Sequence, residues 1–395
     1  MSQRPSEEID SKPQSYIVSP TSTINSLISD QNSLSCLIDS ISVSNFLQGL
    51  TIKLPIICTL PERLGYYSCR LRIDGETDSY HPNKASLLYL RSDYRQLRNV
   101  DLFDGISFDR TRRILPETEH IFRWLHESPD YESFSDIQFV CSTSQILSSM
   151  LSIAYNGSAS WSLLAIRIGR TIYLTIRDPN IYIKRPGPLN ATKLANAHVD
   201  RKFTELVALQ ANGMRSRTSP SGNRDSFYTA NKLDIGQYKI IYPNRVDCIV
   251  DSEQYNQPIE QMKFALLRNR PCDWDQEPDA NVTRAISWWI SSFLSGAETI
   301  IIGEKSKIFE IRDITTMRVD DLLKVQRSNG FKWTPKKCID YLKKALAYID
   351  HRVEEAKVVY RFRWNGTRQN FEHRKLRESP RTFIPHWYHV HGKLS

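Results

Sequence analysis

The sequence lacks the signals that would place it in a membrane or in an oxidising compartment. No apolar run is long enough to span a bilayer, and residues 1–30 hold no basic segment followed by an apolar stretch, so neither membrane insertion nor a signal peptide is expected. The seven cysteines are odd in number, scattered and without a C-x-x-C pair, which disfavours a disulfide scaffold or a zinc ribbon. These absences predict an intracellular protein with reduced thiols, in the cytoplasm, the nucleus or both.

Several common catalytic motifs are missing as well. The chain contains no P-loop, no G-x-S-x-G elbow and no H-E-x-x-H pair. The tail HWYHVH at residues 386–391 has the residue types of a metal site. Because no nearby carboxylate or cysteine completes a ligand set, a packed or solvent-exposed tail is favoured instead.

Positive charge is concentrated toward the C-terminus. Residues 324–395 hold 17 Lys and Arg against 6 Asp and Glu, whereas the whole chain holds 53 and 44. The remainder of the chain is therefore slightly acidic. A basic segment can attract a polyanion through the release of counterions from phosphates. A solvated basic surface is the simpler alternative, and composition alone does not separate the two.

The chain divides by composition into a tail and a globular part. Residues 1–45 contain 13 serines and little periodicity, which predicts a flexible Ser-rich tail, followed by a single domain over 46–395. Helices are expected over 118–127, 144–154, 189–211, 285–294 and 335–355. Strands are expected over 52–60, 66–73, 161–168, 170–177, 239–242, 247–251, 260–266, 299–302, 307–311 and 358–364. This mixed, non-alternating order indicates an α+β fold.

The most informative stretch is an acidic residue followed at short distance by a lysine. We expect Val246-Asp247-Cys248 on one strand and Gln261-Met262-Lys263 on its neighbour. This is the outline of a metal-dependent phosphodiesterase core, in which paired carboxylates hold divalent cations and a lysine positions the water or the phosphate. Taken alone, the outline has little specificity.

The surroundings of this stretch resemble the DXO family of decapping exoribonucleases over residues 88–391. The similar segments occur in the order and at the spacing of the family, and they are SDYRQLR at 92–98, FDG at 103–105, WWISSFL at 288–294, Gly303, Trp333-x-Pro335 and Phe362-Arg363-Trp364. The resemblance implies two mixed β-sheets flanked by helices, in a DXO-like nuclease fold with a PD-(D/E)xK-like core. It also implies a metal-dependent decapping activity.

The positions that correspond to the catalytic residues of that family are mostly substituted. Thr143 stands in place of an arginine, Thr204, Arg245 and Gln261 in place of three glutamates, and Ser291 in place of a glutamine, whereas Asp247 and Lys263 are retained. Asp247 is then the only surviving metal ligand. Because Mg²⁺ takes about six oxygen ligands and usually one or two carboxylates, no metal is expected here, although the family uses Mg²⁺ or Mn²⁺.

Two neighbouring acids do not restore the lost carboxylates. Glu205 and Glu260 each lie one residue from a substituted glutamate. On a strand, an offset of one residue points the side chain to the opposite face. On a helix, it turns the side chain by about 100°. Only a bulge or a shifted alignment would bring either acid into the site.

The resulting hypothesis is a catalytically inactive decapping-nuclease homologue. A basic pocket would bind RNA 5′ ends, nucleotides or a protein partner, and its candidate residues are Arg245, Lys263, Lys336, Lys337, Arg361 and Arg363. In the simpler alternative, Arg245 only neutralises Asp247. A working hydrolase that acts on incomplete or NAD-type caps and then degrades RNA is a second hypothesis. A scaffold that stabilises an exoribonuclease is a third.

Overall fold

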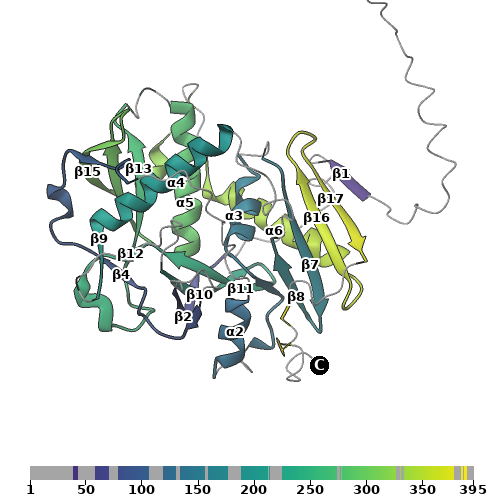
Figure 1. The fold of residues 1–395 in the computed structure, drawn as a ribbon. Helices are drawn as coiled ribbons and strands as arrows, with labels where there is room; N and C mark the ends of the chain where they lie inside the picture. Colours follow the sequence, from purple (N-terminus) through teal and green to yellow (C-terminus); the bar gives the residue numbers. More distant parts are fainter. Residues whose placement is uncertain are drawn as a thin grey trace, which may run out of the picture. The chain divides into compact units, whose positions relative to one another are not determined.

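Two mixed β-sheets organise the protein, as the computed structural model shows (Figure 1). The structure describes residues 39–42, 58–70, 79–105, 119–129, 134–155, 159–176, 188–211, 213, 225–273, 276, 278–325, 330, 333–377, 384–385 and 387–388. These residues all belong to one unit that begins at Asp39. The predicted tail over residues 1–45 lies outside the described residues except for 39–42, so its flexibility stays a prediction.

The larger sheet contains ten strands within the described residues. In spatial order they are β1 (Asp39–Ser42), β17 (Asn370–Leu376), β16 (Val359–Asn365), β7 (Trp161–Ile168), β8 (Thr171–Thr175), β6 (Phe139–Cys141), β11 (Tyr238–Val246), β10 (Ser226–Ile235), β2 (Glu62–Arg70) and β3 (Ser79–His81). Strand β6 pairs in parallel with both β8 and β11, whereas the other pairs are antiparallel. This mixture of pairings confirms the expected α+β class.

The smaller sheet has seven strands in the described part of the chain. In spatial order they are β5 (Val100–Asp101), β15 (Glu310–Arg318), β14 (Thr299–Lys305), β13 (Phe264–Pro271), β12 (Cys248–Ile249), β4 (Leu88–Leu90) and β9 (Ala208–Gln210). It is also mixed, because β13 runs parallel to β14 but antiparallel to β12. Strands β11 and β12 are separated only by Asp247, so the chain passes there from one sheet to the other.

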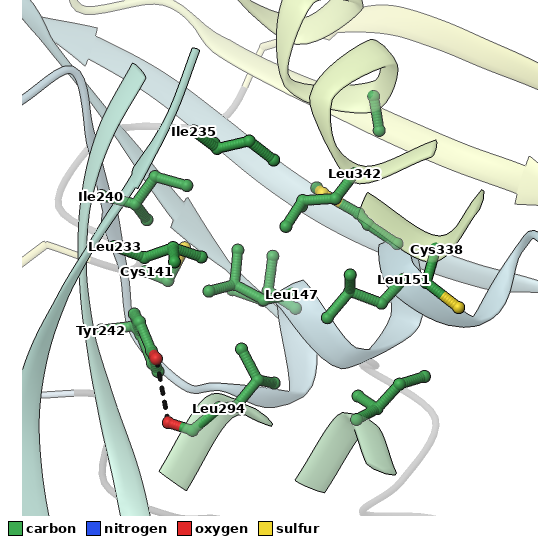
Figure 2. Packing of buried hydrophobic residues seen from close by; sticks show 14 of the residues in the cluster. Cys141, Leu147, Leu151, Leu233, Ile235, Ile240, Tyr242, Leu294, Cys338 and Leu342 are labelled. Atoms are coloured by element: carbon green, nitrogen blue, oxygen red, sulfur yellow. Dashed lines mark hydrogen bonds between the residues drawn. The ribbon is translucent and has the colours of Figure 1, made fainter. Parts of the chain in front are cut away.

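Helices cover the sheets and build three hydrophobic clusters. The main cluster lies between the larger sheet and the helices α3 (Gln145–Ser152), α5 (Pro278–Ser295) and α6 (Pro335–Arg352). Figure 2 shows part of it, where Leu147 of α3 and Leu342 of α6 meet residues of β10 and β11. The buried Tyr242 hydroxyl donates a 2.9 Å hydrogen bond to the Leu294 carbonyl, which ties β11 to α5.

The other two clusters use the remaining helices. Helix α2 (His120–Glu127) packs on the opposite face of the larger sheet, where Phe122 also contacts the tail residue Tyr388. Helix α4 (Pro188–Val207) packs on the smaller sheet through Phe203. None of the described helices is both long enough and apolar enough to cross a membrane.

Apolar runs that are buried on both faces explain the strands that were predicted best. In β7, Leu163 and Ala165 lie in the main cluster, whereas Leu164 and Ile166 lie in the α2 cluster. A strand covered on both sides carries a continuous apolar run, which is why residues 161–168 were predicted with the observed bounds. By contrast, β10 was not predicted. The expected strand over 260–266 begins only at Phe264.

Candidate functional site

Asp247 occupies the junction between the two sheets. It follows Val246, the last residue of β11, and precedes Cys248, the first residue of β12. Strand β12 pairs with β13 in antiparallel register, with Cys248 opposite Ala265. Continuing this register by one residue places Asp247 opposite Leu266. The position that faces the acid across the two strands is therefore occupied by an aliphatic side chain that is buried in the main cluster.

Two arginines and one backbone amide surround the Asp247 carboxylate. Its Oδ2 accepts hydrogen bonds from Nη1 of Arg268 at 2.8 Å and from the backbone N–H of Leu267 at 3.1 Å. Its Oδ1 lies 3.5 Å from Nη2 of Arg245. The aspartate side chain is 8% exposed, Arg268 is 25% exposed and Arg245 is 50% exposed. The three side chains together carry a net charge of +1, and Arg245 is the one most open to solvent.

The structure corrects the expected placement of residues 261–263. Gln261 lies in a turn and donates its backbone N–H to the Pro258 carbonyl, and its side chain is exposed. Lys263 also has an exposed side chain, and its carbonyl accepts from Val250. Lys263 precedes Leu266 by three residues, which corresponds to roughly 10 Å along an extended strand and to the opposite face of the sheet. It is therefore not the cation beside the acid.

The cation beside the acid is Arg268, which the sequence analysis missed. Arg268 follows Leu266 by two residues, so the two side chains share one face of β13. The triplet Leu266-Leu267-Arg268 thus has the x-Φ-cation spacing that the sequence analysis assigned to residues 261–263. A signal for it did exist, because the run Phe264 to Leu267 is apolar and ends in a basic residue. Its first position lacks the acid that would have drawn attention to it.

The other substituted positions carry hydroxyl groups that bond locally. The Thr204 hydroxyl donates to the Asp200 carbonyl one turn earlier in α4, at 3.0 Å. The Ser291 hydroxyl donates to the Ser287 carbonyl in α5, also at 3.0 Å. Thr143 accepts from the Gln145 backbone N–H at the start of α3. Hydroxyls in such bonds are neutral and weak ligands, so these positions add no charge to the site.

The neighbouring acids lie on other elements than Asp247. Glu205 lies 3.8 Å from Arg201 of the same helix. Glu260 is exposed, in the turn before β13. Within the described residues, no three His, Cys, Asp or Glu side chains gather closely enough to hold a metal ion. Divalent ions such as Mg²⁺ and Mn²⁺ prefer several oxygen ligands with one or two carboxylates, so the residues present do not fit either ion.

The candidate basic residues do not form one pocket. Arg245 belongs to β11, whereas Arg361 and Arg363 belong to β16, and β7, β8 and β6 lie between these strands (Figure 1). At the usual spacing between neighbouring strands, four steps amount to about 19 Å. Lys336 and Lys337 open helix α6, where Lys337 Nζ lies 5.0 Å from the Tyr155 ring centroid. The predicted set therefore separates into distinct surfaces.

Two partly buried cations hold the loop that leads into β13. Arg63 donates to the carbonyls of Ile259 and Gly296 at 3.0 Å each, and its guanidinium lies over the Phe264 ring at 4.0 Å. Lys84 donates to the Gln257 carbonyl at 2.8 Å. Burial lowers the pKa of Arg63 and the pKa of Lys84, because it removes water that would otherwise stabilise each charged form. These contacts fix the start of β13 and hence the position of Arg268.

Comparison with known proteins agrees with this architecture. The family model described as RAI1 like PD-(D/E)XK nuclease matches residues 59–389. The decapping and exoribonuclease protein of Bos taurus is 22% identical over 351 residues, which cover 83% of this chain and 84% of that protein. Protein cutoff of Drosophila melanogaster is 23% identical over 264 residues, which cover 64% of this chain and 65% of that protein.

Solved structures share the fold at low sequence identity. Candida albicans Rai1 in complex with pU5-Mn²⁺ superposes with a TM-score of 0.68 at 14% identity, over 89% of this chain and 98% of that one. Scheffersomyces stipitis Rai1 in complex with (3′-NADP)⁺ and calcium ion superposes with a TM-score of 0.66 at 15% identity, over 84% and 92%. The likeness confirms the predicted arrangement of two mixed sheets with flanking helices.

Proposed function

The chain belongs to the RAI1-like PD-(D/E)XK nuclease family, and from this premise we propose that it is a catalytically inactive member that binds RNA 5′ ends. The observation that carries the proposal is the ion pair between Asp247 and Arg268. In a metal-dependent nuclease, the oxygens of such an aspartate bind cations that activate water and stabilise the transferred phosphate. Here Oδ2 instead accepts a hydrogen bond from the guanidinium of Arg268.

Electrostatics at Asp247 oppose the binding of a metal ion. A divalent cation would have to displace Arg268 from Oδ2 and would approach a group of side chains with a net charge of +1. Separating a mostly buried ion pair is unfavourable, because it leaves charges with neither water nor a partner. The opposing position on β13 supplies only the apolar Leu266. Hydrolysis that depends on Mg²⁺ or Mn²⁺ therefore lacks its ligands.

Binding of a phosphate remains chemically favoured at the same place. Arg245 is half exposed, and a planar guanidinium binds phosphate oxygens through two parallel hydrogen bonds. Candida albicans Rai1 is in complex with pU5-Mn²⁺, and the bovine relative is named a decapping and exoribonuclease protein. We infer that Arg245 supplies in this chain the positive charge that a metal ion supplies in a metal-dependent relative. The 5′ phosphate would then be held without being cleaved.

Two measurements test the proposal. Purified protein is incubated in Mn²⁺ with 5′-triphosphate, NAD-capped and unmethylated-cap RNA, and no turnover is expected. Fluorescence anisotropy then compares a 5′-phosphorylated oligouridylate with its 5′-hydroxyl counterpart, with and without EDTA. We expect a preference for the phosphate that EDTA does not change and that Arg245→Gln removes.

The outcomes separate the two parts of the proposal. Arg170→Gln is the matched control, because Arg170 is an exposed arginine between β7 and β8. It should retain the preference for the phosphate. Turnover that Asp247→Ala abolishes would overturn catalytic inactivity. Equal affinity for the two oligouridylates would overturn binding of the 5′ end.

A further inference from the structure

A second group of positive side chains lies on β16 and β17, at the end of the larger sheet beside β1 (Figure 1). The aromatic residues of these strands face the main cluster and include Tyr360, Phe362, Trp364 and Phe371. Because side chains alternate along a strand, the intervening residues point to the other face. Three of these intervening residues are Arg361, Arg363 and Arg374.

The pairing register brings two of these arginines together. Arg361 lies directly opposite Arg374 in the antiparallel pair of β16 and β17. Like charges in directly opposed positions destabilise a sheet. Among the described residues, none of the three guanidinium groups has an ion pair, a hydrogen bond or a ring partner. No ion pair within the described residues offsets the repulsion.

We infer that Arg361, Arg363 and Arg374 bind the backbone phosphates of an RNA chain, on a surface separate from the Asp247 site. Guanidinium groups form strong hydrogen bonds with phosphate oxygens. A bound polyanion would offset the repulsion between the arginines, because its phosphates attract each of them. The choice of RNA rests on the proposed function. The presence of a second surface rests on the register and on the lack of internal partners.

The composition of this face predicts how the RNA would be held. The neighbouring positions on this face of β7, β16 and β17 are small, amide, aliphatic or acidic. Tyr173 and Tyr388, which pack on the same face, are buried in the α2 cluster. Proteins that bind single strands by base stacking use aromatic side chains, so contact here would be limited to the backbone. Binding should therefore be independent of sequence and strongly dependent on salt.

One acidic residue on the face provides a test with the opposite sign. Glu372 lies opposite Arg363 in the same register, and it likewise has no ion pair among the described residues. It lowers the positive potential that an approaching phosphate meets. Glu372→Gln should therefore tighten RNA binding, whereas removal of an arginine should weaken it.

The experiment measures binding of a long 5′-hydroxyl oligouridylate, which lacks the terminal phosphate assigned to Arg245. The triple variant Arg361→Gln/Arg363→Gln/Arg374→Gln should weaken binding, and the slope of log Kd against log salt should fall by about 2, at about 0.7 per phosphate contact on a single strand. Arg170→Gln serves as the control with a single charge removed. The melting temperature of Arg374→Gln should equal or exceed that of the wild type.

Three results would overturn the inference. The first is an unchanged salt slope in the triple variant. The second is a lower melting temperature of Arg374→Gln, which would assign the arginine a structural role. The third is a triple variant that no longer binds phosphatidylserine vesicles, which the wild type binds, but that keeps its affinity for RNA. This result would identify an acidic membrane surface as the ligand. Failure of the Arg245→Gln test would leave these results untouched, because the probe carries no 5′ phosphate.

Discussion

Nη1 of Arg268 lies 2.8 Å from Oδ2 of Asp247, and this contact joins β13 to the junction between the two sheets. Arg268 also donates to its own neighbour, the Leu267 carbonyl, at 2.7 Å. Both bonds are made by Nη1, so the guanidinium cannot move away without losing them. This geometry accounts for a stable neutralised carboxylate where a nuclease would need a free one.

Removing Arg268 should destabilise the protein. Arg268→Ala leaves Asp247 mostly buried and without the closer of its two arginines, and we expect a loss of about 2 kcal/mol in the free energy of unfolding, less than for a fully buried pair because Arg268 is partly exposed. Urea denaturation measures the change. Arg318→Ala breaks the exposed pair with Asp320 and should cost at most about 0.5 kcal/mol.

A double-mutant cycle sharpens this test. Asp247→Asn combined with Arg268→Ala should be less destabilising than the sum of the two single changes, because the unpaired charge has gone. Additive losses would show that the two side chains act independently. In that case the ion pair would not be the interaction that holds the junction.

Introducing carboxylates should create a metal site at the triplet 266–268 and not at the triplet 261–263. Leu266→Glu together with Arg245→Glu would place two new acids beside Asp247, and we expect Mn²⁺ to raise the melting temperature of this variant. Gln261→Glu with Arg245→Glu is the matched control, because residue 261 lies in an exposed turn away from Asp247. A larger Mn²⁺ effect in the control would show that the counterpart of the metal-binding triplet is 261–263 after all.

The class of the fold and the place of Asp247 in the site could be predicted from the sequence, but the ion-pair partner of Asp247 could not. Residues 161–168 and 335–352 were recognisable because their apolar periodicity is local. The partner of Asp247 depends on the register of β12 and β13, which Arg63 and Lys84 fix through distant carbonyls. Such long-range pairing leaves no periodic signal in one sequence.

Two errors in the prediction have related causes. The helix expected over 189–211 ends at Val207, because Ala208 to Gln210 pair with β4 as β9. Helix and strand propensities of three residues cannot outweigh a sheet edge that is available for pairing. The basic residues of α6 and β16 were grouped by sequence proximity, whereas the order of strands in the larger sheet separates β16 from β11.

Gly303 should not tolerate a methyl group. A Cβ at this position would lie 2.7 Å from Oδ1 of Asn269, 2.7 Å from Cε2 of Phe203 and 2.9 Å from Cδ1 of Ile311. These neighbours belong to a packed interior, so we expect Gly303→Ala to cost about 2 kcal/mol. Gly105→Ala provides a comparison, because Gly105 has a φ of 74° but no atom within 4 Å of its Cβ position, and strain alone should cost about 1 kcal/mol. Equal losses would contradict the packing argument.

Acidification should destabilise the packing of α4 through His198. Burial lowers the pKa of His198 below its ordinary value of 6.5, and the positive charges of Arg201 and Lys202 act in the same direction. Its Nδ1 accepts a 2.7 Å hydrogen bond from Arg201, which a protonated ring could not accept, and Nε2 lies 3.2 Å from the Asp104 carbonyl. The folded protein therefore favours the neutral imidazole.

The sign of the effect follows from proton linkage. Because the pKa of His198 is lower in the folded state than in the unfolded state, the unfolded chain binds more protons as the pH falls below 6.5. The stability contributed by the neutral ring is complete above that pH and is lost as the pH falls through the folded pKa. Urea midpoints on either side of pH 6.5 should show a smaller decrease for His198→Gln than for the wild type. His351→Gln removes an exposed histidine from the last turn of α6 and should leave the decrease unchanged, so an equal reduction in both variants would rule out His198 as its source.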